Sequence, residues 1–190
     1  MERISQNHSV SKGHLLLAEP FMLDQNFRRA VILLCSHEDK MGTVGFILNK
    51  QLDLTVNELL NDFPEFEAPV YYGGPVATET IHYVHDKGDI LDESEEVGEG
   101  ICWGGDFDKL KFLIKSELIK PHNIRFYLGY SGWSAMQLKD ELTYGSWIVS
   151  KMHPNHILKV HPNQLWKDVL IQKGNSYGVI GQMPDSFYLN

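Results

Sequence analysis

Runs of mainly apolar residues, separated by glycine, proline and charged residues, dominate the first half of the chain. The runs at 13–18 and 30–36 are almost continuously apolar, which is typical of strands covered on both faces. A third run at 43–49 follows a polar connection that contains Gly42, so the second and third runs predict a hairpin. Shorter strands are predicted at 70–72, 81–85, 124–128 and 146–149.

Capping residues ahead of apolar positions predict helices in three places. Thr55 and Glu58 match the capping box, in which a hydroxyl and a carboxylate satisfy the first N–H groups of a short helix. Asp106 precedes apolar residues spaced by three and four, and we expect it to cap a second helix. Asn163 is expected to cap another helix, over 164–173.

The most distinctive stretch of the sequence is 128–141. An apolar strand there leads through Gly129 and Gly132 into apolar positions at helical spacing. The pattern predicts a strand, a tight glycine turn and a helix. Because a helix start carries N–H groups without intrahelical partners, this turn is also a candidate anion site.

Length and composition fit one folded α+β domain. The 190 residues are 43% hydrophobic and 22% charged, which is close to the globular average. No linker or low-complexity segment divides the chain, so we expect a single domain over residues 1–190, strand-rich in its first half. Residues 1–12 are polar and are expected to be loosely held. The acid-rich segment 89–99 predicts an exposed hairpin or loop.

Charge argues against nucleic acid as a partner. The 17 Lys and Arg against 25 Asp and Glu give a net charge of −8, which repels a phosphate backbone. The two cysteines, Cys35 and Cys102, show no disulfide framework or Cys-x-x-Cys spacing. With no signal-peptide pattern and no apolar run long enough to cross a bilayer, the sequence predicts a soluble cytoplasmic protein without membrane association.

Ser131 and the His37 loop are the two candidates for catalysis in this sequence. Ser131 lies between two glycines, but the nucleophile elbow Gly-x-Ser-x-Gly requires the second glycine where Trp133 stands. Tight packing around a buried Trp133 is therefore the favoured reading. The loop segment 37–39 offers a histidine beside two carboxylates, which suits a general base or a ligand, although loops between strands are commonly polar.

The histidines do not predict a metal site. His82 and His85 are three apart on a predicted strand and so point to opposite faces. His153, His156 and His161 lack the fuller ligand set that zinc requires. We expect no metal and no cofactor.

Glycines near strand ends instead suggest a ligand pocket. If they converge, one positive charge, backbone N–H groups and aromatic walls would surround a small anionic molecule. The alternative is that the glycines only form the corners of a curved sheet. The predicted ligand-binding residues are Asn49, Lys50, Gly73, Gly74, Tyr130, Gly132 and Trp133.

Several separate motifs, in order, resemble the AlgH/YqgE family, a group of bacterial proteins without a settled biochemical role. The resemblance covers nearly the whole chain, and the segments that carry it are 16–20, 27–32, 37–50, 72–76, 129–133, 137–138 and 165–166. It implies an α+β domain whose strongly curved mixed sheet forms a partial barrel, with helices packed around it. Some members are labelled transcriptional regulators, but the resemblance brings no catalytic residues. This chain has Ser131 where alanine is common, which argues against a shared nucleophile.

These observations favour a binding or regulatory protein, with a small anionic molecule or another protein as partner, over an enzyme. One alternative is a transcriptional regulator that acts on DNA. It requires a localised basic surface, although the sequence shows no helix-turn-helix with a basic recognition helix. The other alternative is a hydrolase that uses Ser131 or the His37 loop.

Overall fold

The computed structural model describes residues 9–38, 40–159 and 161–174. Residues 1–8, expected to be loosely held, lie outside the described residues, and residues 9–12 form neither helix nor strand. The strands are β1 (His14–Ala18), β2 (Val31–Glu38), β3 (Gly42–Ile47), β4 (Gln51–Thr55), β5 (Pro69–Tyr72), β6 (Val76–His85), β7 (Glu95–Gly98), β8 (Ile101–Trp103), β9 (Ile124–Trp133) and β10 (Trp147–Lys151). The helices are α1 (Val56–Leu59), α2 (Phe107–Lys115), the 3₁₀ turn η1 (Pro121–Asn123), α3 (Ala135–Thr143), α4 (Pro154–Leu158) and α5 (Pro162–Gln172).

The strands form one mixed sheet, which confirms the α+β class. Eight strands follow the order β10-β1-β2-β3-β9-β6-β8-β7, and β4 joins through β5, which pairs with β9. The β5–β9 pairing is parallel, whereas the neighbours along the main path are antiparallel. The path has two ends and does not return on itself, so the partial barrel implied by the family resemblance is not confirmed.

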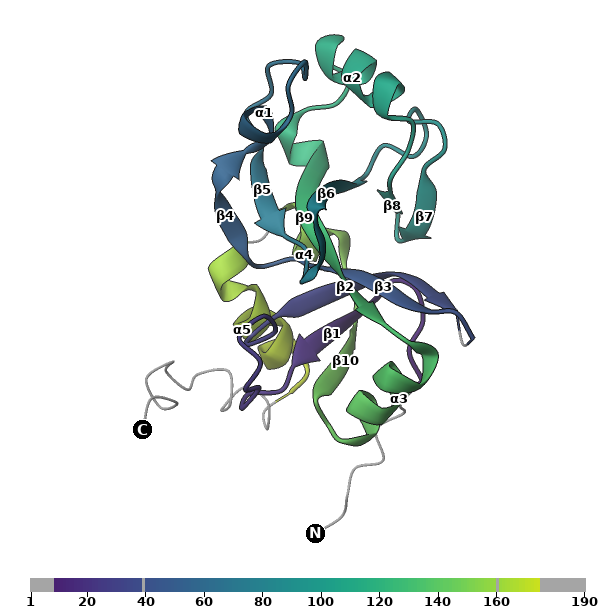
Figure 1. Ribbon diagram of the computed structural model, residues 1–190, viewed down its shortest axis with the longest axis vertical. Helices are drawn as coiled ribbons and strands as arrows, with labels where there is room; N and C mark the ends of the chain where they lie inside the picture. Colours follow the sequence, from purple (N-terminus) through teal and green to yellow (C-terminus); the bar gives the residue numbers. More distant parts are fainter. Residues whose placement is uncertain (1–8, 39, 160, 175–190) are drawn as a thin grey trace.

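The strand β9 joins the two ends of the molecule. Figure 1 shows it running from the part that carries α1 and α2 to the part that carries α3. Its first half pairs with β5 and β6, and its last three residues pair with β3. Residues on β9 therefore contact both groups of elements.

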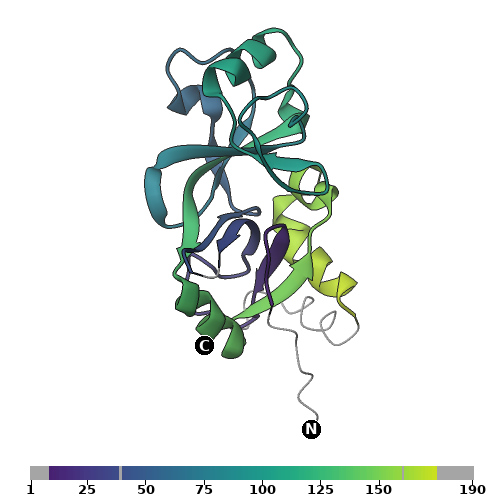
Figure 2. The ribbon, with the colours of Figure 1, turned by 90° about the vertical axis from the view of Figure 1, so that its right-hand side faces the viewer.

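The central strands β1 and β2 are covered on both faces, as their continuous apolar sequence predicts. Leu15 and Leu17 point to the face covered by α5, in a cluster that includes Trp166 and Leu170. Leu16 and Ala18 belong to a separate cluster on the other face, with residues of α3. The helices α4 and α5 accordingly lie on the opposite side of these strands from α3 (Figure 2).

A third apolar cluster lies under α1 and α2. The predicted cap of α2 is confirmed, because the Asp106 side chain accepts a hydrogen bond of 2.7 Å from the Lys109 N–H. The buried residues Leu110, Leu113 and Ile114 form the apolar face of this helix. At α1, Glu58 accepts from the backbone N–H of Thr55 at 2.6 Å, in agreement with the predicted capping box.

Two predicted local features are wrong. Residues 129–133 form no turn, because β9 continues to Trp133 and Ser134 caps α3 directly. Gly129 has φ +64, which allows the strand to bend where it changes neighbours. The cap of α5 is His161 rather than Asn163, because Pro162 starts the helix with a φ that suits its first turn.

Candidate functional site

An open groove of about 550 Å³ lies where the β2–β3 hairpin meets the end of β9 and the start of α3. We call it the hairpin groove. Its size falls within the ~300–1,000 Å³ usual for small-molecule sites. It is lined by Ser36, Glu38, Met41, Gly42, Thr43, Val44, Val76, Tyr130, Gly132, Trp133 and Ser134.

The strand register determines which side chains face the groove. Val44 of β3 pairs with Ser36 of β2 on one side and with Gly132 of β9 on the other. Side chains on directly paired residues share a face of the sheet, so these three form one row across the groove. Glu38 lies opposite Gly42, one row closer to the hairpin tip.

An irregularity in β2 turns two polar residues toward the groove. The β2–β3 register shifts between Leu34 and Ser36, which marks a bulge at Cys35. A bulge of one residue reverses the alternation of side chains beyond it. Ser36 and Glu38 therefore share a face with Val44 instead of with the buried Leu34.

Two glycines shape the floor of the groove. Gly132 has no side chain above the sheet, and a Cβ atom there would lie 3.2 Å from Cε2 of Tyr130. At Gly42, φ is +117 and a Cβ atom would lie 2.4 Å from the Trp133 carbonyl oxygen. The first glycine allows the edge of the Tyr130 ring to lie close to the β9 backbone in the groove, whereas the second allows the hairpin backbone to approach β9.

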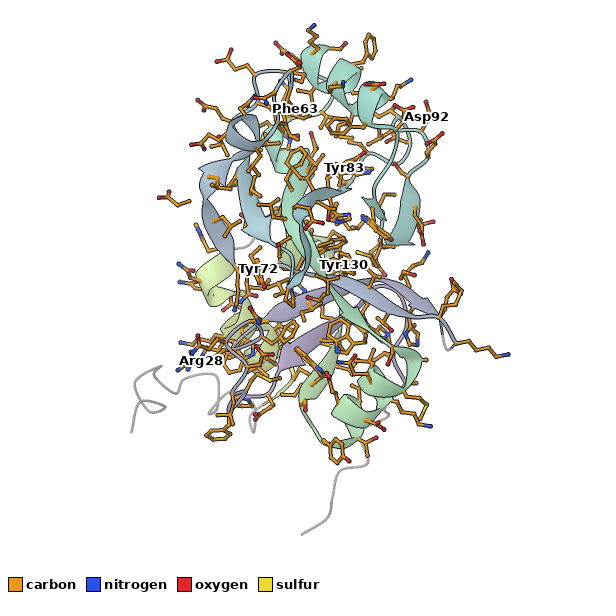
Figure 3. All side chains as sticks on the ribbon, viewed as in Figure 1. Arg28, Phe63, Tyr72, Tyr83, Asp92 and Tyr130 are labelled. Carbon is orange, nitrogen blue, oxygen red and sulfur yellow. The ribbon has the colours of Figure 1, made fainter. Side chains whose placement is uncertain are left out.

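Apolar and aromatic side chains form the walls. Tyr130 lies on β9 at the level where this strand passes β2 and β3 (Figure 3), and its ring meets His82 edge-on at 5.9 Å. Val76 pairs with Tyr130 across the strands and is 36% exposed. Met41 at the hairpin tip is 81% exposed. A flexible thioether and an aromatic ring are well suited to contact an apolar ligand.

The charge of the groove comes from Glu38. No Lys or Arg is among the lining residues, and Glu38 is exposed. The described part of the chain provides no ion pair to this carboxylate. An anionic ligand would therefore meet a like charge, whereas a cation would find a counter-charge.

Some of the backbone N–H donors at the start of α3 already have acceptors within the protein. Ser134 Oγ accepts from the Gln137 N–H, and Gln137 Oε1 accepts from the Ser134 N–H, both at 3.4 Å. This capping box uses two of the donors that an anion would need. The geometry gives little support to the anion site predicted at this helix start.

Trp133 fixes the end of β9 against α3. Its indole N–H donates to Glu141 Oε2 at 2.8 Å, and the indole of Trp147 donates to the same oxygen at 2.7 Å. Phe27 packs against both rings, at 6.1 and 5.5 Å. Only 5% of Trp133 is exposed, so its side chain packs in the core and its backbone lines the groove.

The structure brings only some of the predicted ligand residues to the groove. Tyr130, Gly132 and Trp133 line it. Gly73 and Gly74 pack behind it, because Cβ atoms there would lie 2.2 Å from Gly129 O and 2.3 Å from Tyr130 C. These two glycines contact β9 through backbone packing and do not line the groove.

Asn49 and Lys50 have other contacts. Asn49 accepts from the Val31 N–H and donates to the Arg29 carbonyl, both at 2.8 Å, and so holds the start of β2. Lys50 Nζ donates to the carbonyls of Gln25 and Asn26, both at 2.8 Å. Burial lowers the pKa of Lys50, the nearby Asp24 opposes this shift, and neither Asn49 nor Lys50 lines the groove.

The two catalytic candidates lie in different surroundings. Ser131 is fully buried, and its hydroxyl donates to the Gly73 carbonyl at 3.1 Å. It is therefore not presented to a substrate. His37 Nδ1 is 2.7 Å from the Thr43 hydroxyl, on the sheet face opposite Glu38. Asp39 of the same loop lies outside the described residues.

The histidines lie in separate environments. His85 is fully buried, with Nε2 2.8 Å from the Gly104 carbonyl, and desolvation lowers its pKa. His82 packs against Phe46 at 5.2 Å, and burial lowers its pKa as well. Across the described ranges, no group of three or more His, Cys, Asp or Glu side chains is arranged to hold a metal ion.

None of the helices in the described part of the chain has the length and apolar character needed to cross a bilayer.

Two further grooves lie elsewhere. One, of about 540 Å³, is next to α2 and is lined by Asp62, Phe63, Pro64, Lys111, Phe112 and Lys115. The other, of about 450 Å³, lies over the β7–β8 hairpin and is lined by Asp86, Lys87, Gly88, Asp89, Ser94, Glu96, Gly100 and Cys102. None of the predicted ligand residues lines either groove.

Sequence reasoning missed Ser36, Met41, Val44 and Val76. Ser36 reaches the groove because of the bulge, which leaves no clear signal in an apolar run. Val76 lies after a glycine pair and before an irregular part of β6, so the alternation of side chains along a regular strand does not predict which face it occupies. From the sequence, Gly42 is predicted only to be part of the connection between two strands.

Comparison with known proteins identifies the family. A family model described as AlgH-like matches residues 15–178. A UPF0301 protein from Chlorobaculum parvum is 40% identical over 176 residues, which cover 93% of this chain and 94% of that protein. A UPF0301 protein from Cytophaga hutchinsonii is 38% identical over 183 residues, which cover 95% of this chain and 100% of the relative.

Solved structures share the fold. The solution structure of the AlgH protein from Pseudomonas aeruginosa matches with a TM-score of 0.74 and 26% identity, over 97% of this chain and 98% of that one. A crystal structure of a protein from Corynebacterium diphtheriae matches with a TM-score of 0.75 over 96% of this chain and 95% of that one. At 22% identity, this second likeness concerns the fold alone. From the family model and the close relatives together, the chain belongs to the AlgH-like family.

Proposed function

We propose that this protein is a small-ligand-binding protein and that the hairpin groove is its binding site. The observation that carries the proposal is the glycine floor at Gly132 between side chains of three strands. A site on paired strands holds its walls rigidly, which reduces the entropy lost on binding.

The chemistry of the groove fits binding better than catalysis. Its polar side chains are hydroxyls and one exposed carboxylate, and Thr43, whose hydroxyl is 2.7 Å from His37, is itself only 4% exposed. An enzyme needs an acid, base or nucleophile held within hydrogen-bond reach of a partner in the site. The fully buried Ser131 does not meet this requirement.

A DNA-binding role has weaker support. The helices α4 and α5 follow one another in the chain, as in a helix-turn-helix. The apolar face of the second helix, α5, includes Leu165 and Trp166 and is buried in the core. The part of α5 left for contact carries Lys167 next to Asp168. Such a mixed surface does not supply the phosphate contacts that dominate DNA affinity.

Gly132→Val tests the proposal by filling the groove. A valine suits a strand, and its Cβ would meet side-chain atoms of Tyr130 and Val76 and no backbone atom, so we expect the variant to fold with a small shift of the Tyr130 ring. Wild type and variant are screened by thermal shift against a metabolite panel that spans cations, neutral compounds and anions. Ser150→Val on β10 adds a valine outside the groove and serves as the matched control.

The expected result is at least one compound that raises the melting temperature of wild type and Ser150→Val but not of Gly132→Val. Stabilisation that survives in Gly132→Val would place binding elsewhere and contradict the proposal. A panel that stabilises none of the three proteins would contradict it as well.

A further inference from the structure

The ends of the hairpin groove differ in chemistry. At the hairpin-tip end, Glu38 lies opposite Gly42, and Ser134 of the α3 cap is close by in the lining. At the other end, Tyr130 pairs with Val76. Between the two ends, the row of Ser36, Val44 and Gly132 forms the floor.

The spacing of the strands sets the length of a ligand that spans these ends. Glu38 is on β2 and Tyr130 is on β9, with β3 between them. Neighbouring strands are about 4.8 Å apart, so two spacings separate the backbones by about 10 Å across the sheet. The register adds an offset of four residues, or about 13 Å along the strands, so the two backbones are roughly 16 Å apart. A glutamate and a tyrosine side chain can each span several ångströms of this distance, and a ring with a short chain would bridge the rest.

Among the described residues, no basic side chain pairs with Glu38 at its end of the groove. It is exposed, no basic residue lines the groove, and none of the ion pairs in the described ranges includes it. An ammonium or guanidinium group can therefore approach the carboxylate without displacing a protein cation. Because the carboxylate is exposed, the pairing should weaken as salt concentration rises.

The Tyr130 end is suited to an apolar or aromatic group. The Tyr130 ring is part-buried and held edge-on by His82, and Val76 lies beside it. Gly132 lies directly beside the ring edge, because a Cβ atom there would be 3.2 Å from Cε2 of Tyr130 and 3.9 Å from Cγ2 of Val76. A flat group placed there would contact glycine, valine and tyrosine at once.

Resting on the proposed function, we infer that the ligand of the hairpin groove is a small amphipathic cation. Its amine or guanidinium pairs with Glu38, and its aromatic or branched apolar end packs between Tyr130 and Val76. This assignment replaces the anionic ligand predicted from the sequence, because the cation in that prediction, Lys50, contacts loop carbonyls outside the groove.

Three probes of similar size but different charge test the inference. Phenethylamine, 2-phenylethanol and phenylacetate are titrated separately into the protein, and dissociation constants are measured from amide chemical shifts. Phenethylamine should bind about fivefold more tightly than 2-phenylethanol, as expected for an exposed charge pair, and phenylacetate should bind most weakly. Propylamine, which lacks the ring, should bind more weakly than phenethylamine.

Glu38→Gln should remove the preference for the amine over the alcohol while leaving alcohol binding unchanged. Glu79→Gln is the matched control, because it removes the same charge from an exposed strand position outside the lining. A preference that persists in Glu38→Gln, or that falls equally in Glu79→Gln, would overturn the inference.

The two proposals fail in distinguishable ways. If the alcohol and the amine bind equally and Gly132→Val abolishes both, the groove is a binding site but its ligand is not a cation. If none of the probes binds in a manner that depends on Gly132, the cation assignment is overturned, and the metabolite panel alone decides whether the groove binds a ligand.

Discussion

At the scale of single residues, Glu141 links α3 to the sheet. One of its carboxylate oxygens accepts from the indole N–H groups of Trp133 and Trp147, and the other accepts from Gln137 Nε2 at 2.9 Å. Both tryptophans are nearly inaccessible, at 5% and 2% exposure. Buried donors without an acceptor are costly, so this one carboxylate supports the end of β9 that lines the groove.

Glu141→Ala should therefore lower the free energy of unfolding by about 2–4 kcal/mol, since it leaves two buried N–H groups without an acceptor. Urea denaturation of wild type and variant measures the loss. Asp140→Ala, an exposed neighbour on the same helix, should change the free energy of unfolding by less than about 0.5 kcal/mol. Equal effects of the two substitutions would show that the carboxylate does not stabilise the fold.

The two cysteines should be unreactive in the folded protein. Burial raises the pKa of the Cys35 thiol far above its usual range, and burial also raises the pKa of Cys102. A higher pKa means less thiolate, which is the reactive form, at any given pH. Ellman's reagent at pH 8 should modify neither thiol within minutes in native protein and both in urea. Rapid labelling of Cys35 in native protein would contradict its burial.

At the scale of elements, the bend in β9 matters most. Gly129 has φ +64, and a Cβ atom there would lie 2.6 Å from Gly74 O and 2.8 Å from Val76 O. The glycine is thus needed both for its backbone conformation and for close packing against Gly74 and the start of β6. This bend lets one strand pair with β5 and β6 first and with β3 afterwards.

Gly129→Ala should destabilise the protein by at least about 2 kcal/mol more than Gly145→Ala does. Gly145 is the matched control, because its φ of +80 is similar but a Cβ atom there would meet nothing within 4 Å. Both substitutions carry the cost of a left-handed backbone, and only the first adds a clash with backbone atoms. Thermal and urea unfolding provide the comparison, and a similar loss in both variants would refute the packing role of Gly129.

Most elements could be predicted from the sequence, whereas the course of β9 could not. The apolar runs of β1 and β2 and the caps of α1 and α2 are local signals, and the structure confirms them. Glycines at 129 and 132 are equally compatible with a turn and with a bent strand. Only the change of partner strands, which depends on distant residues, decides between the two.

The candidate site was predictable in part, for the same reason. Tyr130 and Gly132 were identified because they lie in a distinctive segment, and both line the groove. Asn49 and Lys50 were assigned to the same pocket from their place at a strand end. Their actual partners lie about twenty residues earlier in the chain and carry no local signal.

At the scale of the whole molecule, buried histidines should make stability depend on pH. Desolvation is the leading cause that lowers the pKa values of His14, His82, His85 and His156 in the folded protein. The unfolded chain binds protons at a pKa near 6.5, and the folded protein binds them only at lower pH. The stability from neutral histidines is therefore present above pH ~6.5 and is lost as pH falls toward the folded values.

The free energy of unfolding should accordingly fall between pH 7.5 and pH 5.5, a range in which ordinary carboxylates stay ionised. Urea denaturation at several pH values in this range measures the change. A flat profile, or greater stability at pH 5.5, would contradict the assignment of these histidines as neutral in the folded state.

We propose that ligand binding occurs at the junction where β2, β3, β9 and α3 meet. An amide NMR spectrum recorded during a phenethylamine titration tests this claim most directly, because each backbone N–H reports its own surroundings. The largest shifts should cluster at Ser36, Val44, Gly132 and Ser134, and they should disappear in Gly132→Val. Shifts that cluster instead around Phe63 and Phe112 beside α2, or that are spread evenly over the protein, would contradict it.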